Sequence, residues 1–134
     1  MDAKKFAMAS VAGGVMLFLL GFVFYGVLLS EFMEANAAPG VVKEMPDMVP
    51  LILGELVLAA FLTLILSRWS GITSFGAGAK AGALLGLLLG LGLNLEMYGT
   101  MNLSGPATIP LDTLVNAVRM GLTGGVIGVV LGRS

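Results

Sequence analysis

The sequence predicts an all-α protein that crosses a membrane four times as one helical bundle. Hydrophobic residues make up 57% of the 134 residues and charged residues only 11%, less than half of the roughly 25% usual in soluble domains. The apolar residues form stretches of about 20, each long enough for a hydrocarbon core of roughly 30 Å. Because these stretches are continuous and do not alternate, they indicate helices and not barrel strands. We therefore expect a polytopic transmembrane four-helix bundle in which residues 1–134 form a single domain.

The first two spans are predicted at about residues 6–29 and 48–67. The first follows Lys4-Lys5 and carries no charge, and it is too long for the apolar core of a signal peptide, which runs roughly 7–15 residues. An acidic, proline-containing loop is expected between the two spans, at residues 30–47. A cation and an interfacial aromatic residue, Arg68-Trp69, close the second span.

The last two spans are predicted at about residues 76–98 and 111–132. A short turn containing glycine and serine precedes the third span, and Met97-Tyr98 ends it. The connection to the fourth span, residues 99–110, holds no Lys or Arg. The first and third spans each end in Tyr-Gly, and the second and fourth in Leu-Ser-Arg and Leu-Gly-Arg. These short matches suggest two helical hairpins related as parallel repeats.

The basic residues predict an orientation. In a four-span arrangement one side of the membrane receives most of the Lys and Arg residues, and the other side receives only Lys43. Basic loops stay on the cytoplasmic side, so we expect both termini in the cytoplasm and the protein in a bacterial inner (plasma) membrane. The residues on the cytoplasmic side would be Lys4, Lys5, Arg68, Lys80 and Arg133.

Glycines recur at intervals of four in the last two spans. This small-xxx-small pattern, or glycine zipper, lets helix backbones approach closely in lipid, where no hydrophobic drive pulls helices together. We expect these glycines to join helices or subunits, so the protein would be a homo-oligomer in the lipid bilayer. The residues concerned are Gly78, Gly82, Gly86, Gly90, Gly121, Gly124, Gly125 and Gly128.

Arg119 is the most informative residue, since a guanidinium within an apolar span costs several kcal/mol unless a partner or water meets it. Two carboxylates, Glu55 and Glu96, are the candidate partners. At about 1.5 Å per residue, Arg119 lies about 12 Å and Glu55 about 10 Å below the outer surface, whereas Glu96 lies near that surface. Glu55 therefore matches Arg119 best in depth. With Asn94 and Asn116, these residues form the predicted intramembrane polar cluster.

Composition excludes several classes of site. The chain has no Cys and no His, which removes disulfides, thiol catalysis and most zinc or copper sites. A net charge of −1 gives no case for nucleic-acid binding. Ser and Thr residues have no accompanying base, and an arginine between the intramembrane carboxylates favours structural acids over a general acid. Whether Glu55 is protonated stays open from the sequence. We expect no enzyme activity, no cofactor and no metal.

Several short motifs resemble a family of small, uncharacterised four-helix membrane proteins of bacteria, a domain of unknown function. They are Lys5-Phe6, Gly13-Gly14, Leu20-Gly21, Tyr25-Gly26, Ser67-Arg68-Trp69, residues 75–82, residues 97–100 and Asn102-Leu103. The resemblance implies a membrane bundle and no particular activity.

Two functions remain open from the sequence. The first is a structural or accessory helix bundle in which the ion pair fixes the register of two helices. The alternative is a small channel or transporter with an outward-facing polar site around Glu55, Glu96 and Arg119. A continuous water-accessible path would favour the alternative, whereas a dry interior sealed by glycine contacts would favour the bundle. The residues expected to line such a path are Thr63, Asn94, Asn116 and Thr123.

Overall fold

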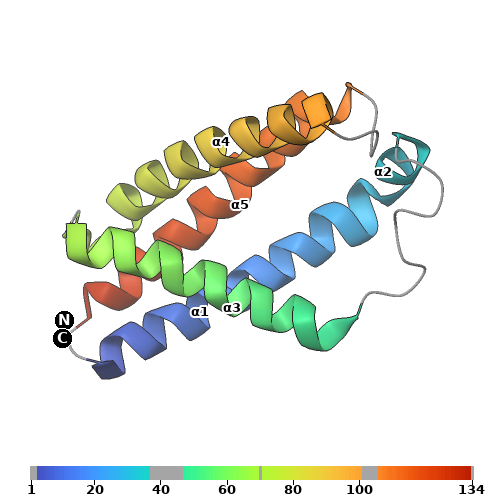
Figure 1. Cartoon of the computed structure of the whole chain (residues 1–134). Helices are drawn as coiled ribbons and strands as arrows, with labels where there is room; N and C mark the ends of the chain where they lie inside the picture. The colour runs from blue at the N-terminus through green and yellow to red at the C-terminus, as the bar shows by residue number, and fades with distance from the viewer. Residues whose placement is uncertain (1–2, 37–46, 70, 101–105, 134) are drawn as a thin grey trace.

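The computed structural model describes residues 3–36, 47–69, 71–100 and 106–133. Within them are four helices that are long and apolar enough to cross a membrane: Ala3–Leu28, Met48–Arg68, Phe75–Thr100 and Thr108–Leu131. They pack together as a bundle (Figure 1). The predicted class, all-α with four apolar spans, is confirmed, and each helix lies close to its predicted range.

The first two spans each combine an α-helix with a π-helical end. The first consists of α1 (Ala3–Gly21) and η1 (Phe22–Leu28), and the second of α3 (Met48–Leu64) and η2 (Ile65–Trp69). In η1 the chain bonds to the fifth residue back, as in the 2.8 Å bond from Leu29 N to Phe24 O. Such π segments are rare and often accompany functional sites. Here η1 carries Tyr25, which takes part in the buried polar network below.

The remaining elements are α2 (Ser30–Asn36), α4 (Phe75–Thr100) and α5 (Thr108–Leu131). The expectation of a loop from residue 30 was wrong for its first part, because the chain forms α2 there. Glu31 lies in the first turn of α2, where a carboxylate interacts favourably with the helix dipole. The rest of that predicted loop, residues 37–46, lies outside the described residues, as does Asn102.

The central helix of the bundle is α5. Of the most apolar 18-residue window of α5, 50% is buried inside the protein, against 17% to 22% for the other three spans. One side of α5 packs against α4 and another against α1, and α1 also packs against α3. The start of α1 and the end of α5 lie at the same end of the bundle (Figure 1).

Glycines make the contact between α4 and α5. The buried residues of α4 are all glycines: Gly78, Gly82, Gly86 and Gly90. A methyl group added at Gly82 would overlap the backbone carbonyl of Met120, and one added at Gly78 would overlap that of Gly124. The two backbones therefore touch directly, which is the close approach that small residues permit in lipid. These glycines are used within one chain, and association of copies stays a prediction.

Glycines of α5 complete this contact. A methyl group at Gly121 would lie 3.2 Å from Ala83 Cβ. At Gly125 it would overlap the Phe75 ring, and at Gly128 the carbonyl of Ser74. The small-residue spacing in the sequence thus corresponds to one continuous helix–helix contact.

Exposed charges divide between the two ends of the bundle. One end, where α1 and α4 begin and α3/η2 and α5 end, is here called the basic end (Figure 1). Its exposed charged residues are Lys4, Arg68, Lys80 and Arg133. The opposite end, here called the acidic end, has the exposed residues Glu31, Asp47 and Glu96. This division follows the charge asymmetry of the sequence; which end faces the cytoplasm stays a prediction.

Our first prediction tests that orientation. The chain has no native cysteine, so single cysteines report without background. Ala35→Cys and Ala107→Cys, both exposed near the acidic end, should react with a membrane-impermeant thiol reagent added to intact cells. Thr73→Cys, exposed at the basic end, should react only after the cells are permeabilised. The reverse labelling pattern would show that the termini face outward.

The second prediction concerns the glycine contact. Gly82→Ala should destabilise the bundle by about 1–3 kcal/mol, because α5 would have to move away from the added methyl group. Gly92→Ala is the matched control on the same helix, since a methyl group there meets nothing within 4 Å. The control should be neutral or slightly stabilising, because Ala is the better helix former. Equal unfolding in detergent for the two variants would contradict the contact.

Candidate functional site

Arg119 lies between three helices and forms an ion pair with Glu55. Its Nη2 is 3.1 Å from Glu55 Oε1 and 3.4 Å from Oε2. Only 11% of the Arg119 side chain and 12% of the Glu55 side chain are exposed. The depth argument from the sequence thus selected the carboxylate that the structure pairs with Arg119. This pair connects α5 to α3.

The same nitrogen also binds α1. Arg119 Nη2 donates to the backbone carbonyl of Leu17 at 2.8 Å. Since Nη2 carries two hydrogens, one can serve Leu17 O and the other the Glu55 carboxylate. Gly21 makes room for this arrangement, because a methyl group there would lie 2.9 Å from Nη2. One guanidinium therefore fixes α1, α3 and α5 against one another.

A second carboxylate, Asp112, organises the next layer toward the acidic end. Its Oδ2 accepts hydrogen bonds from Asn94 Nδ2 at 2.7 Å and from Asn116 Nδ2 at 3.1 Å. Its Oδ1 accepts a hydrogen bond from the hydroxyl of Tyr25. Asp112 thereby ties η1 and α4 to α5. A carboxylate with three donors is well solvated by the protein itself, which offsets the cost of removing it from water.

Tyr25 joins the two layers into one network. Its hydroxyl binds Asp112, and the Arg119 guanidinium lies over its ring, 5.4 Å from the ring centroid. A cation at this distance from an aromatic face is attracted by the ring quadrupole, more strongly where water is excluded. All four spans therefore contribute to a single polar network on the acidic-end side of the bundle, here called the Arg119–Asp112 network: Leu17, Tyr25, Glu55, Asn94, Asp112, Asn116 and Arg119.

Glu96 is the predicted cluster residue that lies elsewhere. Its side chain is exposed. Among the described residues, the carboxylate that pairs with Arg119 is that of Glu55. Asn94 faces α5, and two further residues turn a helix by about 200°. Glu96 therefore points away from the partner helix. Depth alone placed it near the cluster, but helix phase turns it outward.

Asp112, Tyr25 and Gly21 were absent from the predicted cluster. The spacing of Asp112, four residues before Asn116 and seven before Arg119, was a usable signal because such residues share a helix face. Tyr25 gave only a weak signal, because it lies near the end of an uncharged span. Nothing in the sequence marked Gly21, because its role is to leave space for side chains from two other helices.

Toward the basic end the interior becomes apolar. The core there is formed by Ala9, Leu17, Ala59, Leu62, Leu66, Ile127 and Leu131, with Met120 beside it. Thr63 and Thr123 are fully buried, at 0% exposure. The Thr63 hydroxyl donates to Ala59 O of its own helix at 2.7 Å. These two threonines therefore lie within packed side chains and not along a visible path.

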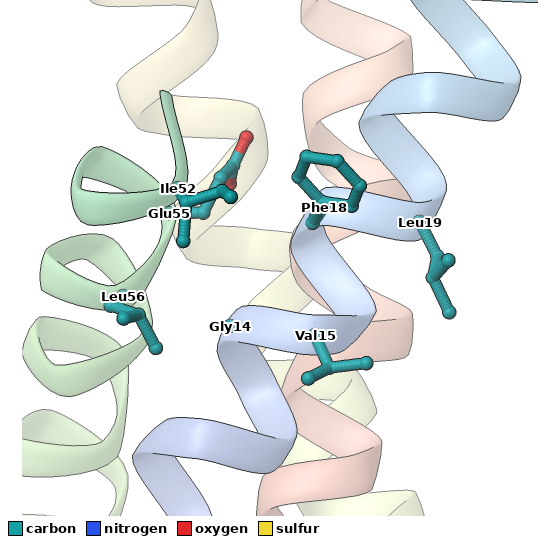
Figure 2. A pocket seen from close by; sticks show the side chains of 7 residues that line it. All are labelled: Gly14, Val15, Phe18, Leu19, Ile52, Glu55 and Leu56. Carbon is teal, nitrogen blue, oxygen red and sulfur yellow. The ribbon is translucent and has the colours of Figure 1, made fainter. Parts of the chain in front are cut away.

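A groove runs beside the ion pair on the outer surface of the bundle, between α1 and α3 (Figure 2). It measures about 220 Å³, and its wall is apolar except for Glu55. The Glu55 side chain leaves α3 toward α1 (Figure 2). The lining residues are Gly14, Val15, Phe18, Leu19, Ile52, Glu55 and Leu56.

The chemistry open to this network is that of fixed, paired charges. Within residues 3–36, 47–69, 71–100 and 106–133, no three carboxylates gather as metal ligands would. The Nε of Arg119 is buried without a hydrogen-bond partner in this part of the chain, as is the hydroxyl of Thr123 one turn further along α5. The guanidinium thus keeps one free donor next to its ion pair.

No protein-family model, no curated protein and no solved structure matches this chain. Of the resemblance to a family of small bacterial four-helix proteins, only the expected four-helix membrane bundle is therefore supported. The chain is a small multi-span membrane protein with four apolar helices, and no family is identified for it.

The third prediction is a double-mutant cycle on the ion pair. Arg119→Met and Glu55→Gln should each destabilise the bundle by roughly 3–5 kcal/mol, because each leaves a buried charge without its partner. The double variant should recover much of that loss, since no lone charge remains. Stability would be measured by reversible unfolding in mixed detergent micelles.

Two further variants give stability changes with which those of the ion-pair variants can be compared. Glu96→Gln is the matched control, because its side chain is exposed, and it should change stability little. Asp112→Asn should cost about 1–3 kcal/mol, because it replaces an acceptor by a donor among three donating groups. Strictly additive losses for Arg119→Met and Glu55→Gln would mean that the two residues are not energetic partners.

Proposed function

We propose that this chain is a structural or accessory helix bundle of the membrane and has no enzyme activity. The observation that carries the proposal is the closure of the Arg119–Asp112 network on itself. Arg119, Glu55 and Asp112 each find their main partners within the chain. A site that binds a charged substrate would be expected to leave its charge unpaired, whereas here Arg119 and Glu55 are paired with each other and the Nε donor of Arg119 is left without a partner.

The apolar half of the interior supports the same proposal. A pore or alternating pathway needs polar groups along its length. Apart from the hydroxyls of Thr63 and Thr123, the basic-end half is packed with apolar side chains. Among them are Leu17, Leu62, Leu66 and Ile127. Direct backbone contact between α4 and α5 also leaves no room for a passage there. If copies associate, they would use other faces, because the α4–α5 glycines are already buried.

The second candidate is a small channel or transporter with an outward-facing polar site. The observation that favours it is the groove between α1 and α3, which brings a lateral opening next to Glu55. In that function the site would consist of Glu55 and Arg119, without Glu96, which is exposed on α4 and does not line the groove. The alternative requires the ion pair to open during transport.

The fourth prediction separates these functions by thiol accessibility. Thr63→Cys and Thr123→Cys should stay unreactive toward a small, membrane-impermeant thiol reagent in vesicles, because both positions are fully buried. Ala107→Cys is the positive control, since it is exposed at the acidic end. In proteoliposomes, the unmodified chain should not raise ion flux above that of protein-free vesicles.

Reaction at Thr63→Cys or Thr123→Cys, at a rate near that of the control, would reveal a water-filled path and favour the transporter. Flux that is lost in Glu55→Gln but kept in Glu96→Gln would lead to the same conclusion. It would also assign the ion pair to transport.

A further inference from the structure

The basic end presents one exposed cation from each of the four spans. Lys4 is at the start of α1, Arg68 in η2, Lys80 near the start of α4 and Arg133 just beyond α5. Among the residues that the structure describes, no acidic side chain shares this end, and none of these four has a carboxylate partner. Within the described part of the chain, no carboxylate neutralises these four charges.

The backbone that carries three of these cations, Arg68, Lys80 and Arg133, packs closely against neighbouring segments. The turn between η2 and α4 lies against the end of α5: a methyl group on Gly132 would overlap Thr73 O, and one on Gly128 would overlap Ser74 O. The turn also bonds back to η2, with Ile72 N 2.9 Å from Leu66 O. Arg68, Lys80 and Arg133 thus project from backbone whose position is fixed, which lowers the ordering cost of binding.

The position of Lys80 indicates what lies around it. It follows Gly78 by two residues, or about 200° of helix turn, and Gly78 faces α5. Lys80 therefore points away from the bundle, on a helix whose neighbouring leucines, such as Leu84, are exposed to lipid. A lysine at this place extends its aliphatic stem along the apolar surface and its ammonium toward the headgroup region.

We propose that the basic end binds the headgroups of anionic phospholipids in the adjoining leaflet, through Lys4, Arg68, Lys80 and Arg133. Phosphate groups lie at the depth where these side chains end, and a net negative headgroup is not neutralised by an ammonium of its own, as a zwitterionic one is. The exposed Glu31 and Glu96 disfavour anionic lipids at the other end. The selectivity is therefore confined to one leaflet. This inference does not depend on whether the bundle is structural or transports a substrate.

The fifth prediction is tested by native mass spectrometry of the full chain in detergent. The chain is titrated with phosphatidylglycerol or with phosphatidylcholine of the same acyl chains. We expect a preference of about tenfold or more for phosphatidylglycerol, from several basic contacts near the surface. The preference should fall as salt is raised, because exposed charges are screened. The variant Lys4→Gln/Arg68→Gln/Lys80→Gln/Arg133→Gln should bind the two lipids almost equally.

Two matched variants keep the result interpretable if the quadruple variant folds poorly. Lys4→Arg/Arg68→Lys/Lys80→Arg/Arg133→Lys conserves charge and should keep the preference. Glu31→Gln/Glu96→Gln changes the opposite end and should not weaken it. Equal binding of both lipids by the original chain, or an undiminished preference in the folded glutamine variant, would overturn the proposal. Competition by millimolar inorganic phosphate would assign the site to free phosphate instead of lipid.

Discussion

The cost of holding a guanidinium in hydrocarbon is the constraint on which the rest of this structure depends. Arg119 cannot leave its span for water, so the bundle must bring acceptors to it. Glu55 supplies a carboxylate, Leu17 a backbone carbonyl and Tyr25 an aromatic face. Because these come from two other helices, satisfying one side chain fixes the register of three spans. Gly21 is small for the same reason: any larger residue would displace the guanidinium.

The third span, α4, is attached by a different mechanism. It presents leucines to lipid and buries only glycines, so the α4–α5 contact rests on backbone packing, which is effective where water provides no hydrophobic drive. At the acidic end, the hydrogen bond from Asn94 to Asp112 adds a directional contact that fixes the position of α4 along α5. The bundle thus combines a nonspecific close contact with one specific polar bond. The polar bond also connects α4 to the network around Arg119.

Most of the fold followed from the sequence. Four long apolar stretches require four helices, because the backbone must satisfy its own hydrogen bonds in lipid. Glycines at intervals of four, such as Gly78 and Gly82, required a close contact, and their direct approach to α5 is the form it took. Depth along a span depends only on residue count, so the sequence favoured Glu55 over Glu96 as the partner of Arg119 but left the choice open.

Tertiary structure decided what depth and spacing leave open. Glu96 lies above the depth of Arg119 and is also exposed on the outer face of α4, and only the rotation of α4 against α5 settles which face it occupies. Asp112 became the centre of a hydrogen-bond layer because Tyr25 and Asn94, distant in sequence, meet it across two interfaces. The sequence by itself determined the helices, their depth relations and the charges at each end. The rotation of each helix about its own axis decides which polar groups touch. That rotation depends on packing among all four spans at once.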